Sequence, residues 1–415
     1  GNIACLKLRE IKKRSEMFSE LMLMNRMLQL LFALGLLLSL STCRSSSTLF
    51  ARGKVNKPEN SVSPIDLPIV VKQNLFYVEV EIEGEVYNFL FDSGAPMVIS
   101  HELAEKYNTK VLRRATIRDS QGKQQRQDYV RMPDFKLGDR TFSDLVAISA
   151  DLKASPLLNC LKLDGILGAN AMQFQYWDFS PEDGILRMSD SKEHWPKGKK
   201  YVLPFSIKSS RTPLVALNIN GSQIKGITFD TGSNGTLSLP KSLSSSFKPE
   251  AAKFKSYGFL SGGLFGSALD TAYEFEMKFE FPDTIIPVLV EQEQTKQGKL
   301  LGMSFLRQFH VFMDYQEGEI LLMPRKFEPE QGTYPLTPYY QDEQVIIGSL
   351  NSLLPPEHQS LAIGDTIIAV EDFQLPEQVS VDDFCRVVQS FQDEEESLVI
   401  QVKGKGRIRV ARTAK

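Results

Sequence analysis

An internal duplication constrains the fold of this 415-residue chain more than any other feature. The residues Phe-Asp-Ser-Gly-Ala at positions 91–95 return as Phe-Asp-Thr-Gly-Ser at positions 229–233. In both segments an apolar stretch ends in Asp, and a hydroxyl residue, a glycine and a small residue follow. One such segment alone would indicate little more than a turn. Two copies inside a longer repeat predict two related halves that each bring one Asp to a shared site.

The duplication extends beyond the two Asp residues. An apolar-apolar-Gly element follows each of them, at residues 166–168 in the first copy and 300–302 in the second. An aromatic strand and a glycine-containing turn then come in the same order in both copies. We therefore expect two homologous lobes, at residues 64–190 and 191–328.

The residue types around each Asp suit a rigid pair of carboxylates. Gly94 and Gly232 permit a closeness of approach that a Cβ would block. The hydroxyls of Ser93 and Thr231 are suited to hydrogen-bond across the junction between the halves. Backbone N–H groups and the Ser233 hydroxyl are candidates to orient the carboxylates. The residues expected to support the dyad of Asp92 and Asp230 are Ser93, Gly94, Ala95, Thr231, Gly232 and Ser233.

Two carboxylates held about 3 Å apart do not both ionise easily, so they share a proton. The ionised member takes a proton from a bound water, which attacks a peptide carbonyl, and the other member donates a proton to the developing oxyanion. Because the titration belongs to the pair, neither Asp is assigned as the acid or the base.

Over about residues 64–328 the chain resembles the aspartic peptidases of the pepsin and retropepsin kind. The resemblance rests on an apolar pair before Asp-Ser/Thr-Gly-Ala/Ser and on the apolar-apolar-Gly element, both present twice and in order. It implies a mainly β, two-lobed acid-protease fold in a compact retropepsin-like form, with both copies in one chain. It also implies catalytic roles for Asp92 and Asp230, a peptide or protein substrate, and no metal or organic cofactor.

Composition agrees with a mainly β protein. Hydrophobic residues make up 42% of the chain, enough for several cores, and short apolar runs alternate with Gly, Pro and Asp turns. The formal net charge of −3 gives no reason to expect nucleic-acid binding. The four His residues are scattered without the spacing of metal ligands, and the sequence shows no serine- or cysteine-nucleophile pattern.

A substrate-covering hairpin is expected after each Asp. In the first half, residues 115–123 form a strand that enters a turn, and the return strand lies near residues 128–131. In the second half, residues 257–266 carry the glycines that a mobile tip needs. The first tip is polar and the second apolar, which predicts an asymmetric cleft.

The N-terminal residues 1–43 read as an extension and a signal segment. An apolar run at residues 30–40 is too short to span a membrane comfortably, and it leads to Leu-Ser-Thr-Cys at residues 40–43. This resembles a bacterial lipoprotein signal, which makes Cys43 a candidate for lipidation, although ordinary signal cleavage and an uncleaved anchor remain open. Residues 44–63 are rich in Ser, Lys and Asn and read as a tether. We expect an exported protein of the bacterial cell envelope, anchored to the membrane through an N-terminal lipid on the periplasmic or cell-surface side.

A further domain is expected at residues 336–415, after a linker at residues 329–335. Residues 361–371 resemble the Gly-Asp-x-Ile strand turn of PDZ domains, although no clear carboxylate-binding loop precedes them. A helical pattern at residues 381–389 and a closing strand at residues 397–403 lie where that fold needs them. Two roles stay open for this PDZ-like domain: it captures a peptide by strand addition, or it steadies the second lobe.

The cysteine pattern argues against disulfides. Cys5 and Cys43 belong to the N-terminal segment, and only Cys160 and Cys385 remain, in different predicted domains. A structural disulfide framework is therefore not expected, despite export.

The sequence thus predicts an aspartic endopeptidase, expected to be a monomer, with Asp92 and Asp230 as its catalytic residues. Its predicted partners are a peptide or protein substrate, a possible peptide ligand of the PDZ-like domain, and the membrane. A noncatalytic peptide-binding lipoprotein with the same fold is the alternative, and a protein that cuts only its own tether or one partner is a third possibility.

Overall fold

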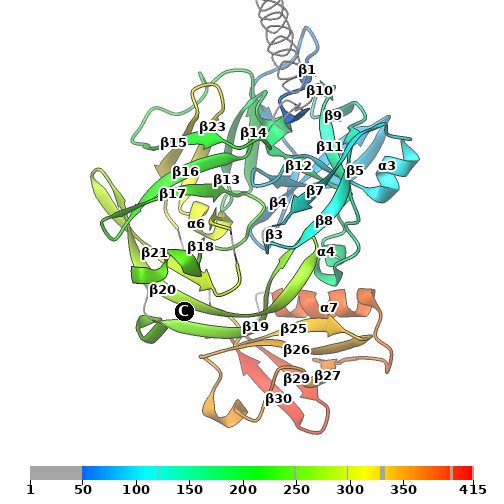
Figure 1. The fold of residues 1–415 in the computed structure, drawn as a ribbon, viewed down its shortest axis with the longest axis vertical. Coiled ribbons are helices and arrows are strands. Elements are labelled where there is room, and N and C mark those ends of the chain that lie inside the picture. The colour runs from blue at the N-terminus through cyan, green and yellow to red at the C-terminus, as the bar shows by residue number, and fades with distance from the viewer. Residues whose placement is uncertain are drawn as a thin grey trace, which may run out of the picture. The chain divides into compact units, whose positions relative to one another are not determined.

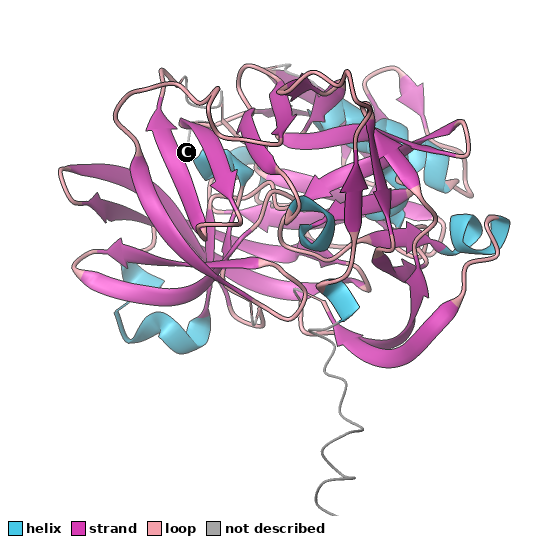
Figure 2. Cartoon of the chain, turned by 90° about the horizontal axis from the view of Figure 1, so that it is seen from above, coloured by secondary structure: helices cyan, strands magenta, loops and turns pink. Residues whose placement is uncertain are grey.

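The computed structural model describes residues 49–119, 121–246, 249–296, 298–327, 332–392 and 396–413. β-Strands dominate the described chain (Figure 2), so the protein is mainly β, as the sequence predicts. The predicted signal segment and the lipidation candidate Cys43 lie outside the described residues. No helix among the residues that are described is long and apolar enough to cross a membrane.

The first repeat, residues 64–190, and the segment before it consist mostly of short strands (Figure 1). Their elements are β1 (Lys54–Asn56), β2 (Ile65–Asp66), β3 (Ile69–Lys72), β4 (Leu75–Ile82), β5 (Glu85–Asp92), β6 (Val98–Ser100), α3 (His101–Lys106), β7 (Val111–Arg118), β8 (Gln124–Arg131), β9 (Phe135–Leu137), β10 (Arg140–Ser143), β11 (Val146–Ala150), α4 (Pro156–Cys160), β12 (Gly165–Gly168), α5 (Ala169–Met172), β13 (Tyr176–Ser180) and β14 (Ile185–Ser189).

The second repeat, residues 191–328, has corresponding elements and a longer hairpin. They are β15 (Tyr201–Ile207), β16 (Pro213–Ile219), β17 (Ser222–Phe229), β18 (Leu237–Pro240), the 3₁₀ helices η1 (Lys241–Ser246) and η2 (Pro249–Ala251), β19 (Phe254–Gly263), β20 (Gly266–Phe281), β21 (Thr284–Glu293), β22 (Leu300–Leu301), α6 (Met303–Leu306), β23 (Phe309–Asp314) and β24 (Glu319–Pro324).

The two repeats share one pattern of strand pairing. In the first, β12 is parallel to β5 and antiparallel to β6, and β6 is parallel to β11. In the second, β22 is parallel to β17 and antiparallel to β18, and β18 is parallel to β21. The duplication in the sequence is therefore also a duplication of topology.

A shared sheet and a common apolar core join the repeats. Strand β13 of the first repeat pairs with β23 of the second, with Asp178 opposite Phe312. Fully buried aromatic side chains from both repeats, among them Phe91, Trp177 and Phe229, belong to one apolar cluster. The strands that carry the two Asp residues are thereby fixed relative to each other.

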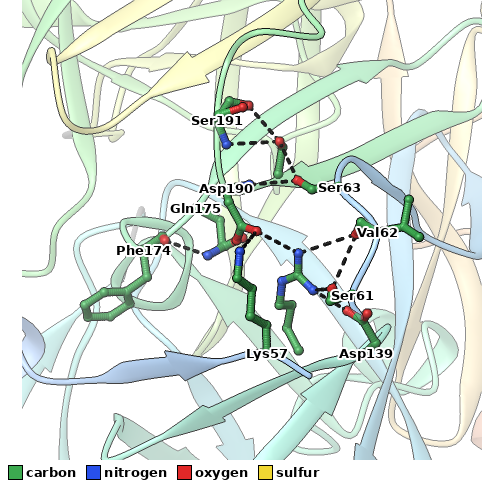
Figure 3. Close-up of polar contacts among 11 residues, drawn as sticks. Lys57, Ser61, Val62, Ser63, Asp139, Phe174, Gln175, Asp190 and Ser191 are labelled. Carbon is green, nitrogen blue, oxygen red and sulfur yellow. Dashed lines mark hydrogen bonds and ion pairs between the residues drawn. The ribbon is translucent and has the colours of Figure 1, made fainter. Parts of the chain in front are cut away.

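Part of the segment that the sequence predicts as a tether is folded onto the first repeat. Strand β1 pairs with β10, and the fully buried guanidinium of Arg140 bonds to Asp139 and Asp190 at 2.6 and 3.0 Å. Figure 3 shows Asp190 also in contact with Lys57, at 2.7 Å. The same guanidinium donates to Ser61 Oγ and to Val62 O, so strand pairing, the Lys57 ion pair and these bonds together hold residues 54–63 against the first repeat.

The C-terminal region, described here over residues 332–392 and 396–413, has a core of its own. Its apolar cluster includes Val345, Ile367, Phe384 and Ile400. The predicted helix and closing strand are both present, as α7 and β29. The elements are β25 (Leu336–Gln341), β26 (Gln344–Asn351), η3 (Pro356–His358), β27 (Thr366–Val370), β28 (Phe373–Gln374), α7 (Val381–Gln392), β29 (Ser397–Val402) and β30 (Gly406–Ala411).

The expectation of no structural disulfide is wrong. Cys160 at the end of α4 and Cys385 in α7 are bonded to each other, with their Cα atoms 5.2 Å apart. The two residues are 225 positions apart in the sequence and fall in different predicted domains, which is why their spacing gave no signal. Packing of α4 against α7 (Figure 1) brings them together.

Candidate active site

Asp92 and Asp230 occupy equivalent positions at the ends of two equivalent strands. Asp92 is the last residue of β5 and lies opposite Gly168 of β12. Asp230 follows the last residue of β17, and its backbone N–H donates to Leu301 O at 3.0 Å. In both repeats the Asp lies where an apolar strand, buried among aromatic side chains, ends and a sharp turn begins.

Ser93 and Thr231 connect the two turns by reciprocal hydrogen bonds. The Ser93 N–H donates to Thr231 Oγ1 at 2.9 Å, and the Thr231 N–H donates to Ser93 Oγ at 3.1 Å. Each hydroxyl then donates to the opposite strand, Ser93 to Phe229 O at 2.7 Å and Thr231 to Phe91 O at 3.0 Å. Both side chains are fully buried, so these four bonds form a rigid bridge between the repeats.

The glycines of the two motifs allow each turn to contact the carboxylate of the other. A Cβ on Gly94 would lie 2.4 Å from Asp230 Cγ, and a Cβ on Gly232 would lie 2.3 Å from Asp92 Cγ. Only glycine leaves room for this arrangement. The carboxyl group of each Asp therefore lies against the turn of the other, close enough for the two groups to influence each other's pKa.

Backbone N–H groups hold each carboxylate in position. Asp92 Oδ1 accepts from Gly94 N at 2.7 Å and from Ala95 N at 3.2 Å. Asp230 Oδ1 accepts from Gly232 N at 3.0 Å. Ser233 contributes through its backbone, because its carbonyl accepts from Met303 N at 2.8 Å. All eight motif residues that the sequence singles out thus lie together.

Burial and mutual repulsion shift the titration of the pair. Burial raises the pKa of Asp92 well above its ordinary value, and the neighbouring charge of Asp230 raises it further. Burial also raises the pKa of Asp230, but the hydrogen bonds from Asp92 and Gly232 N–H oppose this rise, as does the positive charge of nearby lysines. The surroundings therefore favour one proton held between the two carboxyl groups.

Two lysines near Asp230 were missed by the sequence analysis. Lys208, at the turn after β15, donates to Thr228 Oγ1 at 3.0 Å, two residues before Asp230. Lys296 is buried and paired with Glu293 at 2.8 Å. Their positive charges lower the pKa of Asp230 against the effect of its burial. Neither lysine belongs to the repeated Asp motif, and each reaches Asp230 from a loop outside it, so no pattern in the sequence pointed to them.

The raised pKa of Asp92 predicts a pH-dependent stability difference between the wild type and Asp92→Asn. The fold binds a proton that the unfolded chain releases near pH 4, so the stabilisation from this group is complete below pH ~4 and is lost as the pH rises through the folded pKa. The Asn variant lacks this loss. Its melting temperature is expected to rise relative to the wild type between pH 4 and pH 7, and parallel curves across that range would contradict the assigned direction.

Two hairpins follow the Asp turns and meet at their tips. The first hairpin is β7–β8, whose turn includes Asp119 and residues 121–123, and the second hairpin is β19–β20 with a tip at residues 263–266. The N–H of Phe265 donates to Asp119 Oδ2 at 3.1 Å, and Lys123 Nζ donates to Ser267 O at 2.7 Å. Both hairpins lie where the sequence predicts them.

The described residues contain no group of three or more His, Cys, Asp or Glu side chains arranged to hold a metal ion. Two His residues serve another purpose, since His194 and His310 contact the buried carboxylate of Asp178 at 2.8 and 2.9 Å. These contacts lie beside the β13–β23 pairing and brace the shared sheet.

Comparison with known families gives one result. Residues 78–171 match the family model described as aspartyl protease. The matched stretch begins within β4, contains Asp92 and ends within α5, so it covers most of the first repeat and none of the second. A comparison with curated proteins gave no match. The match supports an aspartic protease family for this part of the chain and agrees with the geometry of its Asp turn.

Proposed function

We propose that the protein is an aspartic endopeptidase with a two-lobed acid-protease fold in one chain, and that Asp92 and Asp230 are its catalytic residues. The observation that carries this proposal is the packing of the two Asp turns, in which the carboxyl group of each Asp lies against the glycine of the other turn and the Ser93 and Thr231 hydroxyls bond across the repeats. The aspartyl protease match over residues 78–171 is a sequence comparison that does not use the geometry of the site, and it supports the same reaction class.

In the proposed mechanism, a water lies between the two carboxyl groups. The ionised carboxyl group takes a proton from this water as it attacks the scissile carbonyl, and the protonated group donates to the carbonyl oxygen. A second proton transfer to the amide nitrogen then releases the two products. The reciprocal bonds of Ser93 and Thr231 keep the carboxylates in a fixed geometry, so little reorganisation is needed during the reaction.

A noncatalytic peptide-binding role is the alternative. A binding protein would have no need to bury two carboxyl groups against each other, because burial costs each of them desolvation free energy and their charges repel. Retention of both Asp residues, both following glycines and the reciprocal hydroxyl bonds therefore favours catalysis.

The two ends of the chain carry a predicted C-terminal domain and a predicted N-terminal signal. We propose a PDZ-like domain for residues 336–415, and export with an N-terminal lipid on Cys43, which places the enzyme at the cell envelope. The pairing of β26 with β19 favours a bracing role for this domain over recruitment of substrate alone.

A peptide whose scissile carbonyl is replaced by a hydroxyl-bearing tetrahedral carbon is expected to inhibit the enzyme. Such a group mimics the hydrated intermediate, and transition-state analogues bind about 10²–10⁸-fold more tightly than substrates. The measurement is the inhibition constant against a cleaved peptide of the same sequence, with the corresponding methylene compound as the matched control. Equal inhibition by the two compounds would argue against a tetrahedral intermediate held between the carboxyl groups.

A further inference from the structure

The Cys160–Cys385 disulfide completes a series of contacts from the first repeat to the second hairpin. Cys160 ends α4, which lies in the loop between β11 and β12, and β12 runs beside Asp92. Cys385 lies in α7 of the C-terminal region. Strand β26 of that same region pairs with β19, the first strand of the second hairpin (Figure 1).

The connection between β26 and the second hairpin is close and built from the backbone. A Cβ on Gly258 would lie 2.2 Å from Gly348 O, so glycine is required for the two strands to approach. The rings of Phe259 and Tyr339 stack with their centroids 3.9 Å apart. Ser352 N also donates to Lys255 O at 2.8 Å. The base of the hairpin therefore moves together with the C-terminal region.

At the other end, the disulfide is the strongest fastening between α4 and α7. None of the α4 residues is buried, and α4 has no side-chain cap. The ion pair of Lys162 with Asp382, at 2.7 Å, leaves the two side chains 60% and 82% exposed. Exposed pairs of this kind contribute about 0–1 kcal/mol. Leu157 of α4 also packs against the apolar cluster of the C-terminal region, so the disulfide reinforces a small, partly buried contact between this region and the first repeat.

The tips of the two hairpins must part if a polypeptide is to pass between them. The bonds from Phe265 N to Asp119 and from Lys123 to Ser267 O would then break. Because β19 is fixed to β26, and α7 is fixed to α4, displacement of the second hairpin as a unit is opposed by the disulfide.

We propose that the Cys160–Cys385 disulfide is a redox-sensitive strap that restrains opening of the second hairpin. A dithiol opens it by exchange: its thiolate attacks one sulfur of the bond and releases the other cysteine as a thiolate, leaving a mixed disulfide. The second thiol of the reagent then attacks its own sulfur in the mixed disulfide and releases the second cysteine, which gives two protein thiols and one cyclic disulfide. Both cysteines are half-buried, so a small dithiol reaches them without global unfolding. The idea that this strap regulates entry of a substrate rests on the proposed peptidase function. Its mechanical effect on the second hairpin does not depend on that function.

Backbone hydrogen exchange of the Asp92→Asn protein tests the strap without any catalysis. Reduction with dithiothreitol, or the double change Cys160→Ser with Cys385→Ser, is expected to speed exchange over residues 254–267 by about threefold or more. Exchange in β5 and β12 should stay unchanged, which excludes unfolding of the first repeat. Asp382→Asn is the matched control, because it removes the ion pair, keeps the disulfide and should leave exchange in the hairpin as in the parent.

Gly258→Ala tests the other end of the strap. It should disrupt the β19–β26 pairing and speed exchange in the hairpin even with the disulfide intact. Thiol labelling checks that the disulfide has been opened. If Gly258→Ala speeds exchange in the hairpin and opening of the disulfide does not, the proposed strap is wrong.

Cleavage assays of the wild type separate the strap from the proposed function. Reduction is expected to raise kcat/KM for a long polypeptide severalfold more than for a short peptide. Faster hairpin exchange in a protein that cleaves nothing would support the strap and contradict the peptidase. Equal cleavage of both substrates before and after reduction, with unchanged exchange, would support the peptidase and overturn the strap.

Discussion

Asp92→Asn and Asp230→Asn are each expected to lower kcat for peptide cleavage by about 10²–10⁴-fold or more, because each removes a group that transfers a proton in the transition state. Asn has nearly the shape of Asp and still accepts the backbone N–H bonds from residues 94 and 232. The fold should therefore persist, and both variants should lose activity to a similar extent, since the two carboxyl groups share one proton.

The measurement compares initial rates of the wild type and both variants on one cleaved peptide, with melting temperatures as the check on folding. Asp283→Asn is the matched control, because Asp283 lies in an exposed turn and pairs only with Lys199 among the contacts described for it. It should retain full activity. A dyad variant that cleaves at the wild-type rate would remove the shared-dyad mechanism.

Gly168→Ala and Gly302→Ala are expected to have the largest effects on stability, at about 3 kcal/mol each, the upper end of the usual cost of overpacking. A Cβ on Gly168 would lie 2.1 Å from the carbonyl carbon of Pro96, and one on Gly302 would lie 2.5 Å from Gly235 O. These neighbours are backbone atoms of the Asp turns, so no side chain can rotate to relieve the contact. Activity should fall with stability because the same turns carry the carboxylates.

Gly235→Ala is the matched control for these variants. A Cβ at this position would meet only Ser233 Oγ, at 3.8 Å, which is an ordinary contact. Denaturant unfolding of the three variants should show a large loss at positions 168 and 302 and a small change at position 235. Wild-type stability of Gly168→Ala would mean that the first Asp turn does not pack against β12 as closely as described.

The features that the sequence predicted are those with a local signature. Asp92 and Asp230 stand at strand ends marked by apolar runs and glycines, so their turns could be recognised without knowing the rest of the fold. The same holds for the hairpin tips near residues 122 and 263, where glycine marks the turn. The pairing of Ser93 with Thr231 followed from the duplication, because equivalent residues meet across a repeat axis.

The features that the sequence did not predict depend on contacts between distant segments. The Cys160–Cys385 bond requires α4 to pack on α7, and nothing in either segment encodes that meeting. The approach of Lys296 to Asp230 depends on the path of one loop. The pairing of β26 with β19 likewise joins the C-terminal region to the base of the second hairpin, and neither segment carries a local pattern that indicates this contact.

The sharpest test of the proposed peptidase is incubation of the region from Leu49 onward, which keeps β1 and Lys57, with a diverse peptide library read by mass spectrometry at several pH values. The wild-type protein is expected to cleave internal peptide bonds, and every one of those products should be lost in both Asp92→Asn and Asp230→Asn. Products that persist in either variant, or a folded wild-type protein that yields none at any pH, would contradict the proposed function.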